Sequence, residues 1–350
     1  MEKEKDKEKI LESTIKQLEK NYGKGIVMRL SDKAKIQVPV IPTGSISLDY
    51  ALGIGGYPRG RIVEIYGQEA SGKTTLALMA MAETQKLGGS VLFIDVEHAF
   101  DPNYAKIIGV NIEDSKLLIS QPEYGEQALA IMEDAIRGGA VDLIVVDSVA
   151  ALVTKAELEG EMEDMGIGGQ ARLMSKALRK LTGIISKTGT VAIFINQVRE
   201  KISQIPYGGP PETTPGGRAL KFFSSIRIEV KKGESIKGPN NEIIGHIIKA
   251  KVVKNKLAPP YKTAEFELIY GKGINKIGEV FDLAIQVGII KRSGSWYSYN
   301  NEQLAQGKDK AIDYLKENPD LLNKIESEVR EKLKEYKIQG GEDGSEETSE

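Results

Sequence analysis

Residues 61–86 read RIVEIYGQEASGKTTLALMAMAETQK, a short apolar run followed by a glycine-rich turn and a helical stretch. The turn from Gly67 to Thr74 matches G-x-x-x-x-G-K-[ST] in full, between a predicted strand at 61–66 and a predicted helix at 75–86. Glycines permit the backbone angles that turn successive N–H groups inward, and a helix N-terminus presents unpaired N–H groups to the same anion. The segment therefore predicts a phosphate-binding loop in an α/β fold.

The side chains of this loop predict a bound nucleotide. We expect Lys73 to reach the β- and γ-phosphates, and we expect the Thr74 hydroxyl to hold Mg²⁺. The predicted nucleotide-binding residues of the loop are Gly67, Gln68, Glu69, Ala70, Ser71, Gly72, Lys73, Thr74 and Thr75.

Three further apolar runs of strand length, at 91–95, 143–147 and 191–196, lack polar alternation. Such runs are typical of parallel strands buried on both faces, and helical stretches such as 125–137 separate them. From about residue 222 the pattern changes to alternating segments, which predict antiparallel strands. These segments are 226–230, 247–253 and 264–269.

Acidic side chains end two of the apolar runs. Asp147 closes the run at 143–147, where an acid is needed to hold the water shell of the metal. Hydrolysis also needs a group that activates or orients the attacking water, and Glu97 lies just past the run at 91–95. Asp95, at the end of the same run, is expected to face structure.

Two amides, Asn196 and Gln197, end the third run. Gln197 could bond the γ-phosphate and sense its loss. The two amides could equally cap the end of the strand, and the pattern leaves both interpretations open.

Two glycine-rich segments predict loops beside the nucleotide. Residues 198–217 contain too many Pro and Gly residues for a helix or strand, and loops of this length inside compact domains are usually functional or mobile. Residues 159–169 lead into a helix on which Arg172 and Arg179 share one face because they are seven residues apart. Loops with basic flanks could grip a nucleic-acid backbone. Composition alone fits a lid over a small substrate equally well.

Charge is unevenly distributed along the chain. The formal net charge is −2, yet residues 198–256 contain twelve Lys or Arg and five Asp or Glu, a net charge of +7. The last eleven residues carry five acids and no base, which predicts a disordered acidic tail. Absence of Cys and the presence of only two His exclude disulfides, thiolate catalysis and histidine-rich metal sites. No apolar stretch is long enough for a membrane helix and no secretory signal opens the chain, so a cytoplasmic protein without a membrane partner is expected.

The chain is predicted to have four parts: an N-terminal helix and linker at 1–38, an ATPase-like core at 39–273, a small α+β domain at 274–337, and the tail at 338–350. Apolar residues at helical spacing between residues 3 and 22 predict the helix, which could pack on its own core or on a neighbouring subunit. These residues are Ile10, Leu11, Ile15, Leu18 and Tyr22. A strand at 296–299 and two Lys/Glu-rich helices around Pro319 are predicted in the small domain.

The sequence resembles the bacterial RecA recombinases from Ile10 to about Lys337. Beyond the phosphate loop, the matching segments are Asn21–Gly25, Thr43–Asp49, Asp95–His98, Val145–Leu152, Phe194–Gln197, Glu212–Thr214 with Gly216–Gly217, and Lys251–Lys256. The resemblance implies a P-loop core of RecA type with a central, mostly parallel twisted sheet. It further implies a DNA-dependent ATPase that uses ATP and Mg²⁺, forms helical filaments on single-stranded DNA, exchanges that strand into homologous double-stranded DNA, and promotes self-cleavage of the SOS repressor.

The resemblance also assigns residues around the nucleotide. Glu97 becomes the water-activating carboxylate, and Gln197 links the γ-phosphate to the second DNA loop. Asp101 and Tyr104 flank the adenine. Lys254 and Lys256 reach the ATP of the neighbouring subunit. The assigned DNA-binding residues are Ile167, Arg172, Ser175 and Arg179 in the first region, and Lys201, Ile202, Gly216 and Gly217 in the second.

Two other classes of protein share parts of this pattern. A ring-forming motor such as a replicative helicase would show closed rings and ATP-driven unwinding of forked DNA. A small-molecule kinase would transfer phosphate to a metabolite, and DNA would leave its turnover unchanged. The predicted N-terminal helix and Lys254–Lys256 argue against the ring, whereas the long loop at 198–217 and the positive segment argue against the kinase.

Overall fold

The computed structural model describes residues 2–24, 26–27, 38–161, 168–198 and 215–339. It divides into two units, Met1–Pro39 and Val40–Glu350, which are described separately. Among its described residues, the first unit contains helix α1 (Glu2–Tyr22), which confirms the predicted N-terminal helix. Ile10, Leu11 and Tyr22 are exposed on it.

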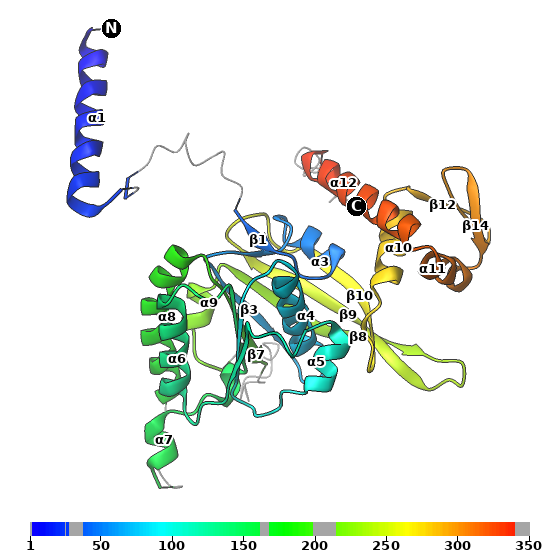
Figure 1. The fold of residues 1–350 in the computed structure, drawn as a ribbon, viewed down its shortest axis with the longest axis horizontal. Helices are drawn as coiled ribbons and strands as arrows, with labels where there is room; N and C mark the ends of the chain where they lie inside the picture. Colours follow the sequence, from blue (N-terminus) through cyan, green and yellow to red (C-terminus); the bar gives the residue numbers. More distant parts are fainter. Residues whose placement is uncertain (1, 25, 28–37, 162–167, 199–214, 340–350) are drawn as a thin grey trace, which may run out of the picture. The chain divides into compact units, whose positions relative to one another are not determined.

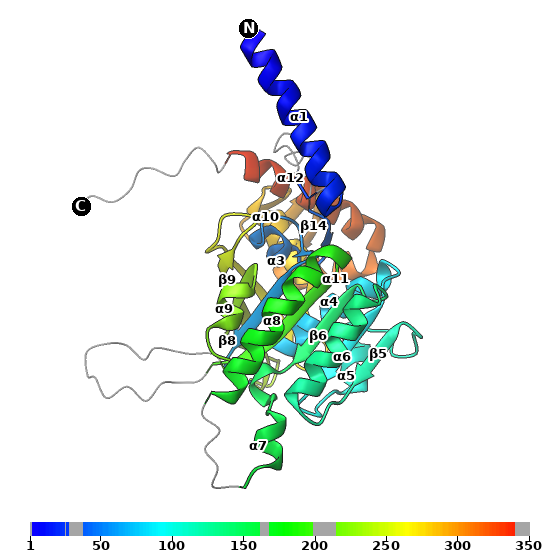
Figure 2. The ribbon, with the colours of Figure 1, turned by 90° about the vertical axis from the view of Figure 1, so that its left-hand side faces the viewer.

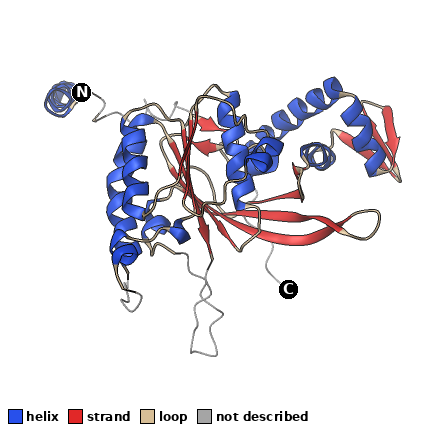
Figure 3. Cartoon of the chain, turned by 60° about the horizontal axis from the view of Figure 1, so that its bottom comes forward, coloured by secondary structure: helices blue, strands red, loops and turns tan. Residues whose placement is uncertain are grey.

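A nine-stranded mixed sheet forms the centre of the second unit (Figure 1). Its strands lie in the order β11 (Gly273–Ile274), β10 (Thr263–Ile269), β9 (Ile243–Asn255), β8 (Ile226–Lys237), β3 (Ile62–Gly67), β7 (Val191–Gln197), β6 (Leu143–Asp147), β4 (Val91–Asp95) and β5 (Leu117–Ser120). Strands from β8 to β5 pair in parallel, and those from β8 to β11 pair antiparallel. The predicted, mostly parallel central sheet is therefore confirmed. Figure 3 shows the long β8–β9 hairpin at its antiparallel side.

Alternate residues of the central strands face opposite layers of helices. In β7, Val191 and Ile193 belong to one core and Ala192 and Phe194 to the other. The first core is covered by α3 (Ile46–Ala51), α4 (Lys73–Lys86) and α5 (Pro102–Ile108), and the second by α6 (Gly125–Arg137), α8 (Gly169–Thr188) and α9 (Ala219–Phe223). Figure 2 shows α6 and α8 side by side. Burial on both faces explains why these strands have apolar sequences without polar alternation.

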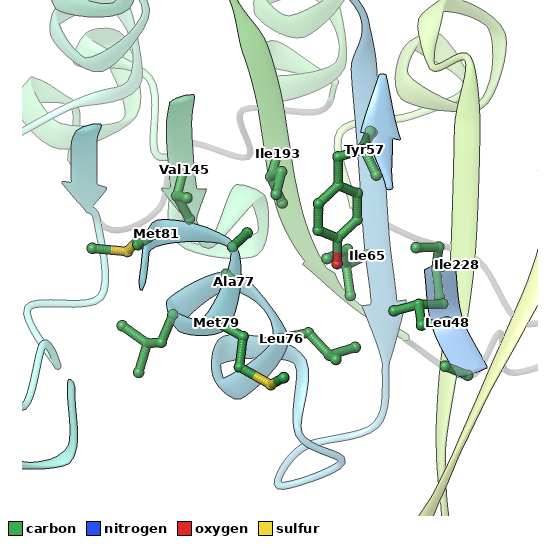
Figure 4. Close-up of a cluster of buried hydrophobic side chains, with 14 of the residues drawn as sticks. Leu48, Tyr57, Ile65, Leu76, Ala77, Met79, Met81, Val145, Ile193 and Ile228 are labelled. Atoms are coloured by element: carbon green, nitrogen blue, oxygen red, sulfur yellow. The ribbon is translucent and has the colours of Figure 1, made fainter. Parts of the chain in front are cut away.

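Helix α4 is anchored by its own side chains. Leu76 and Ala77 have no exposed surface, and Figure 4 shows them beside Ile65, Val145 and Ile193 of the central strands. Burying one side chain of leucine size stabilises the fold by about 1.5–3 kcal/mol. The loop between β3 and α4 therefore joins two firmly packed elements.

Helices and a small sheet follow the central sheet. They are α10 (Lys276–Gln286), β12 (Ile290–Ser293), β13 (Trp296–Tyr299), β14 (Glu302–Gln306), α11 (Lys308–Glu317) and α12 (Pro319–Gln339). Strands β12, β13 and β14 form an antiparallel sheet, of which the sequence predicts only β13. The sequence-predicted boundary between residues 273 and 274 stays a prediction.

This C-terminal region packs on helix α3. Glu279 of α10 accepts hydrogen bonds from Ser45 Oγ (2.5 Å) and from the backbone N–H of Ser47 (3.0 Å). Arg330 of α12 lies 3.5 Å from Asp49 of α3. Burial raises the pKa of Asp49 to about 6 despite hydrogen bonds from Thr43 and the charge of Arg330.

Four further short elements are described in the second unit: the paired strands β1 (Val40–Ile41) and β2 (Tyr57–Pro58), the 3-10 turn η1 (Val149–Ala151), and α7 (Lys155–Glu159). Within the described ranges, no helix is long and apolar enough to cross a membrane. Most of the two predicted loops, residues 162–167 and 199–214, and the tail at 340–350 lie outside the described residues.

Candidate functional site

The turn between β3 and α4 has the backbone shape of an anion-binding nest. Gly72, directly before α4, has φ 94°, and Ala70 has φ 55°. At Gly67 a side chain is excluded because its Cβ would lie 2.0 Å from the carbonyl oxygen of Val230. Ser71 Oγ is buried and has no hydrogen-bond partner among the described residues. A phosphate group fits this site, since the turn offers backbone N–H groups and an unpaired hydroxyl at a helix N-terminus.

Lys73 folds back onto the turn. Its Nζ donates a hydrogen bond to the backbone carbonyl of Gln68 at 2.6 Å. Burial lowers the pKa of Lys73, and the carboxylates of Asp147 and Glu97 oppose this effect. A phosphate oxygen can take the place of the Gln68 carbonyl as acceptor for the ammonium group.

Thr74 and Asp147 meet between the phosphate turn and the end of β6. The Thr74 hydroxyl donates to Asp147 Oδ2 at 2.8 Å. Burial raises the pKa of Asp147 to about 6, with a further contribution from the charges of Glu97 and Asp95. Hydroxyl and carboxylate oxygens beside an excess of negative charge fit Mg²⁺, which prefers hard oxygen ligands and keeps several waters.

Glu97 receives two hydrogen bonds on one carboxylate oxygen. Ser148 Oγ and Gln197 Nε2 both donate to Glu97 Oε1, the latter at 3.2 Å. Glu97 and Ser148 follow β4 and β6, and Gln197 ends β7; the carboxyl ends of these strands meet at one edge of the sheet. The peptide bond between Asp147 and Ser148 is cis. Both hydrogen bonds are made to Oε1, and the second oxygen, Oε2, takes no part in them.

Asp95 stabilises the loop that follows β4. Its carboxylate accepts hydrogen bonds from the backbone N–H of Ala99 (3.0 Å) and of Phe100 (3.2 Å), and from Gln121 Nε2 (2.9 Å). The expectation that Asp95 faces structure is confirmed.

The two residues expected at the adenine lie at the start of α5, Asp101 as its N-cap and Tyr104 within it. Asp101 caps the helix by accepting hydrogen bonds from the N–H groups of Asn103 and Tyr104, at 2.8 and 3.1 Å. The Tyr104 hydroxyl lies 2.8 Å from Thr75 Oγ1 at the start of α4. Both Asp101 and Tyr104 line a cavity of about 100 Å³ together with Thr74, Glu97 and Asp147.

Lys254 lies near the end of β9 and Lys256 directly after it, and both side chains contact α9. Lys254 Nζ donates to the carbonyls of Lys221 (2.6 Å) and Phe222 (3.1 Å), and Lys256 Nζ donates to the latter at 3.2 Å. Burial lowers the pKa of Lys254 to about 8, assisted by the positive charge of Lys256. Among the described residues, no hydrogen bond joins either lysine to the phosphate turn of the same chain.

The described DNA-binding candidates lie on α8 and at the return of the second loop. Arg172 and Arg179 are exposed on α8 and Ser175 is half-buried, while Met174 and Leu178 bury the other side of the helix. Gly216 and Gly217 have φ values of 80° and 70°, which favour glycine. The remaining candidates, Ile167, Lys201 and Ile202, lie outside the described residues.

The sequence analysis missed a buried ion pair beneath the site. Glu64 Oε2 of β3 lies 2.5 Å from Arg227 Nε of β8, and Asn196 Nδ2 donates to Glu64 Oε1 at 3.1 Å. The Arg227 guanidinium also stacks 4.5 Å from the centre of the Tyr66 ring. The available signal was a charged side chain within each strand, Glu64 in IVEIYG and Arg227 in IRIEV.

Comparison with known proteins gives a consistent family. The family model described as RecA N-terminal domain matches residues 9–275, and that described as RecA C-terminal domain matches residues 278–334. The chain is 58% identical to Protein RecA of Chloroherpeton thalassium over 97% of this chain and 93% of that protein. It is 56% identical to Protein RecA of Bacillus subtilis over 93% of this chain and 92% of that protein.

A solved structure agrees in fold. The crystal structure of the RadB recombinase superimposes with a TM-score of 0.51 at 25% identity, covering 67% of this chain and 98% of that one. The chain belongs to the RecA family of DNA-dependent ATPases, which act in homologous recombination and DNA repair.

Proposed function

We propose that the chain hydrolyses ATP with Mg²⁺ at the edge of the central sheet, and that it does so as a filament on single-stranded DNA. In this state it pairs the strand with homologous double-stranded DNA and exchanges strands. The observation that carries the proposal is the convergence of the phosphate nest, the Thr74–Asp147 pair and the doubly held Glu97 at the carboxyl ends of neighbouring parallel strands.

ATP binding uses groups that already face the nest. The N–H groups of residues 67–74 bind the phosphates, and Lys73 exchanges the Gln68 carbonyl for a β- or γ-phosphate oxygen. Thr74 and Asp147 would hold Mg²⁺, which would supply positive charge at the phosphates. Asp101 and Tyr104 lie on the adenine side.

Hydrolysis requires a water that is oriented and loses a proton. Ser148 and Gln197 occupy Oε1 of Glu97 and so fix the direction of the carboxylate. Glu97 Oε2 then accepts the proton of the attacking water. Gln197 ends β7 at the same edge of the sheet and supplies an amide that can respond to the γ-phosphate.

Self-association is supported by one edge of the sheet. Among the described strands, β5 is the last on the parallel side, and Leu118 and Ile119 on it are 51% and 45% exposed. Unpaired strand edges with apolar side chains are templates for pairing with another chain. Within such a filament, Lys254 and Lys256 contact the ATP of the neighbouring subunit, so that each active site is shared.

DNA contacts are assigned to α8 and to the second loop. Arg172 and Arg179 lie on the exposed face of α8, and Gly216 and Gly217 let a backbone approach the phosphates closely. The proposal places the protein in the cytoplasm, where bacterial DNA and ATP are found, and includes the SOS repressor as a partner whose self-cleavage the filament promotes.

The test combines turnover with microscopy. Glu97→Gln should slow ATP hydrolysis on single-stranded DNA at least ~100-fold, as for loss of a positioned base, while filaments still form with a slowly hydrolysed ATP analogue. Glu113→Gln is the matched control, because Glu113 is exposed on a surface turn. Normal ATP turnover in Glu97→Gln would mean that a group other than Glu97 activates the attacking water. A wild-type chain that stays monomeric with DNA and the analogue would contradict the filament.

A further inference from the structure

One peptide unit at the return of the second loop is held from both sides. The carbonyl of Pro215 accepts a hydrogen bond from Asn196 Nδ2, and the N–H of Gly216 donates to Gln170 Oε1, each at 3.1 Å. Gly216 also packs closely on the turn η1, since a Cβ there would lie 3.0 Å from Val149 Cγ1. The Pro215–Gly216 peptide therefore has a fixed position relative to β7 and α8.

Asn196 links this peptide to the nucleotide site. Its buried side chain also donates to Glu64 on β3, the strand that ends in the phosphate turn. The next residue, Gln197, donates to the carboxylate of Glu97. If the Pro215–Gly216 peptide moves, Asn196 passes the movement to β3, and the adjacent Gln197 passes it to the proposed water-activating carboxylate of Glu97.

Gln170 links the same peptide to the end of β6. Its Nε2 donates to the carbonyls of Val149 (2.7 Å) and Leu152 (2.9 Å), which belong to the turn directly after Asp147 and Ser148. All hydrogen-bonding groups of the amide are thereby used. Gln170 lies in the first turn of α8, two residues before Arg172.

We propose that Gln170 is a positioning residue that couples polynucleotide binding to ATP hydrolysis. Its amide joins the first turn of α8, the Pro215–Gly216 peptide and the turn after Asp147 into one hydrogen-bonded unit. The inference rests on the proposed function, in which α8 and Gly216 contact DNA. When DNA shifts either element, the amide transmits the shift to the strand end that carries Asp147 and Ser148, because coupling travels through contiguous packed and hydrogen-bonded groups.

Two substitutions test the amide. Gln170→Leu removes all three hydrogen bonds at similar volume, whereas Gln170→Glu keeps an acceptor for Gly216 N–H and loses the donor to Val149 and Leu152. Gln303→Leu makes the same chemical change at an exposed position of β14 and serves as the control. ATP turnover is measured with and without single-stranded DNA, together with DNA affinity in the slowly hydrolysed ATP analogue and the thermal midpoint.

The ratio of DNA-stimulated to DNA-independent turnover is the deciding quantity. Both Gln170 variants should lower it at least ~10-fold, within the 5–150-fold range of typical coupling between sites, while the control keeps the wild-type ratio. The inference is overturned if either variant keeps that ratio, or if turnover with and without DNA falls by the same factor, which would make Gln170 a support of the fold. If the wild-type chain itself shows no stimulation by DNA, the proposed function fails instead.

Discussion

Arg227 forms an ion pair with Glu64, a buried acidic residue of β3, the strand that leads into the phosphate turn. Removing Arg227 tests how much the stability of the fold depends on this pair. The Glu64 side chain has no exposed surface and that of Arg227 is 11% exposed. We expect Arg227→Met to destabilise the second unit strongly, because the methionine fills space but leaves the Glu64 carboxylate without its countercharge.

The magnitude follows from the contacts. Breaking a buried ion pair by removing one partner costs about 3–5 kcal/mol. Asn196 still donates to Glu64 at 3.1 Å in the variant, so the loss should lie at the lower end, about 3 kcal/mol. Replacing both partners by neutral groups is often close to neutral, so adding Glu64→Gln to Arg227→Met should recover part of the loss, with a coupling energy of about 1–3 kcal/mol.

Urea unfolding followed by circular dichroism measures these differences. The control is Arg137→Met, which breaks the Arg137–Glu133 pair; this pair is also short, at 2.7 Å, but its arginine is 53% exposed. Water and salt screen such a pair, so its loss should matter little. The reasoning is refuted if Arg227→Met costs no more stability than Arg137→Met, or if the double variant shows no coupling.

Three further outcomes are expected. The pKa of Asp49 is raised to about 6, so the folded chain holds a proton that the unfolded chain releases, and the contribution of Asp49 to the free energy of unfolding should fall by about 2 kcal/mol between pH 4.5 and 7. Urea unfolding of wild type and Asp49→Asn at both pH values measures this change. A difference between the two proteins that stays constant with pH would contradict it. Affinity for single-stranded DNA should fall linearly with salt on logarithmic axes, by about 0.7 per neutralised phosphate, in a fluorescence titration; a flat dependence would exclude phosphate contacts. The double variant Lys254→Ala/Lys256→Ala should lose DNA-dependent ATP turnover. Mixing it with Lys73→Ala chains, which keep both lysines, should restore part of the turnover only if the lysines act on the ATP of a neighbouring subunit.

Local pattern was enough to predict the strands and the phosphate turn. The apolar runs at 91–95 and 143–147 and the turn between Gly67 and Thr74 depend on burial and backbone angles that each residue type encodes for itself. Parallel pairing then follows from the helices between the strands, because parallel neighbours need a long crossover. The meeting of Asp147, Glu97 and Gln197 at one edge is a consequence of that pairing.

Contacts between distant segments could not be predicted in the same way. Glu64 and Arg227 are 163 residues apart in the sequence, and no sequence pattern within either strand predicts that these two residues pair. Gln170 belongs to no periodic pattern or motif of the sequence. Its hydrogen bonds to Gly216 and to the turn after β6 are therefore evident only from the structure. Strands β12 and β14 were missed because IKRS and EQLAQ contain few apolar residues, and pairing with β13 rather than burial makes them strands.

The strand order itself explains why nucleotide and polynucleotide can influence each other. Neighbouring strands lie about 4.8 Å apart, so the order β3, β7, β6, β4 brings the phosphate turn, Gln197, Asp147 and Glu97, the proposed base, to one edge of the sheet, where the proposed γ-phosphate would lie. Two of these strands also hold the Pro215–Gly216 peptide: β7 through Asn196, and β6 through the turn that Gln170 binds. A change at the phosphate and a change at the second loop therefore act on the same strand ends, and no separate relay between the two sites is required.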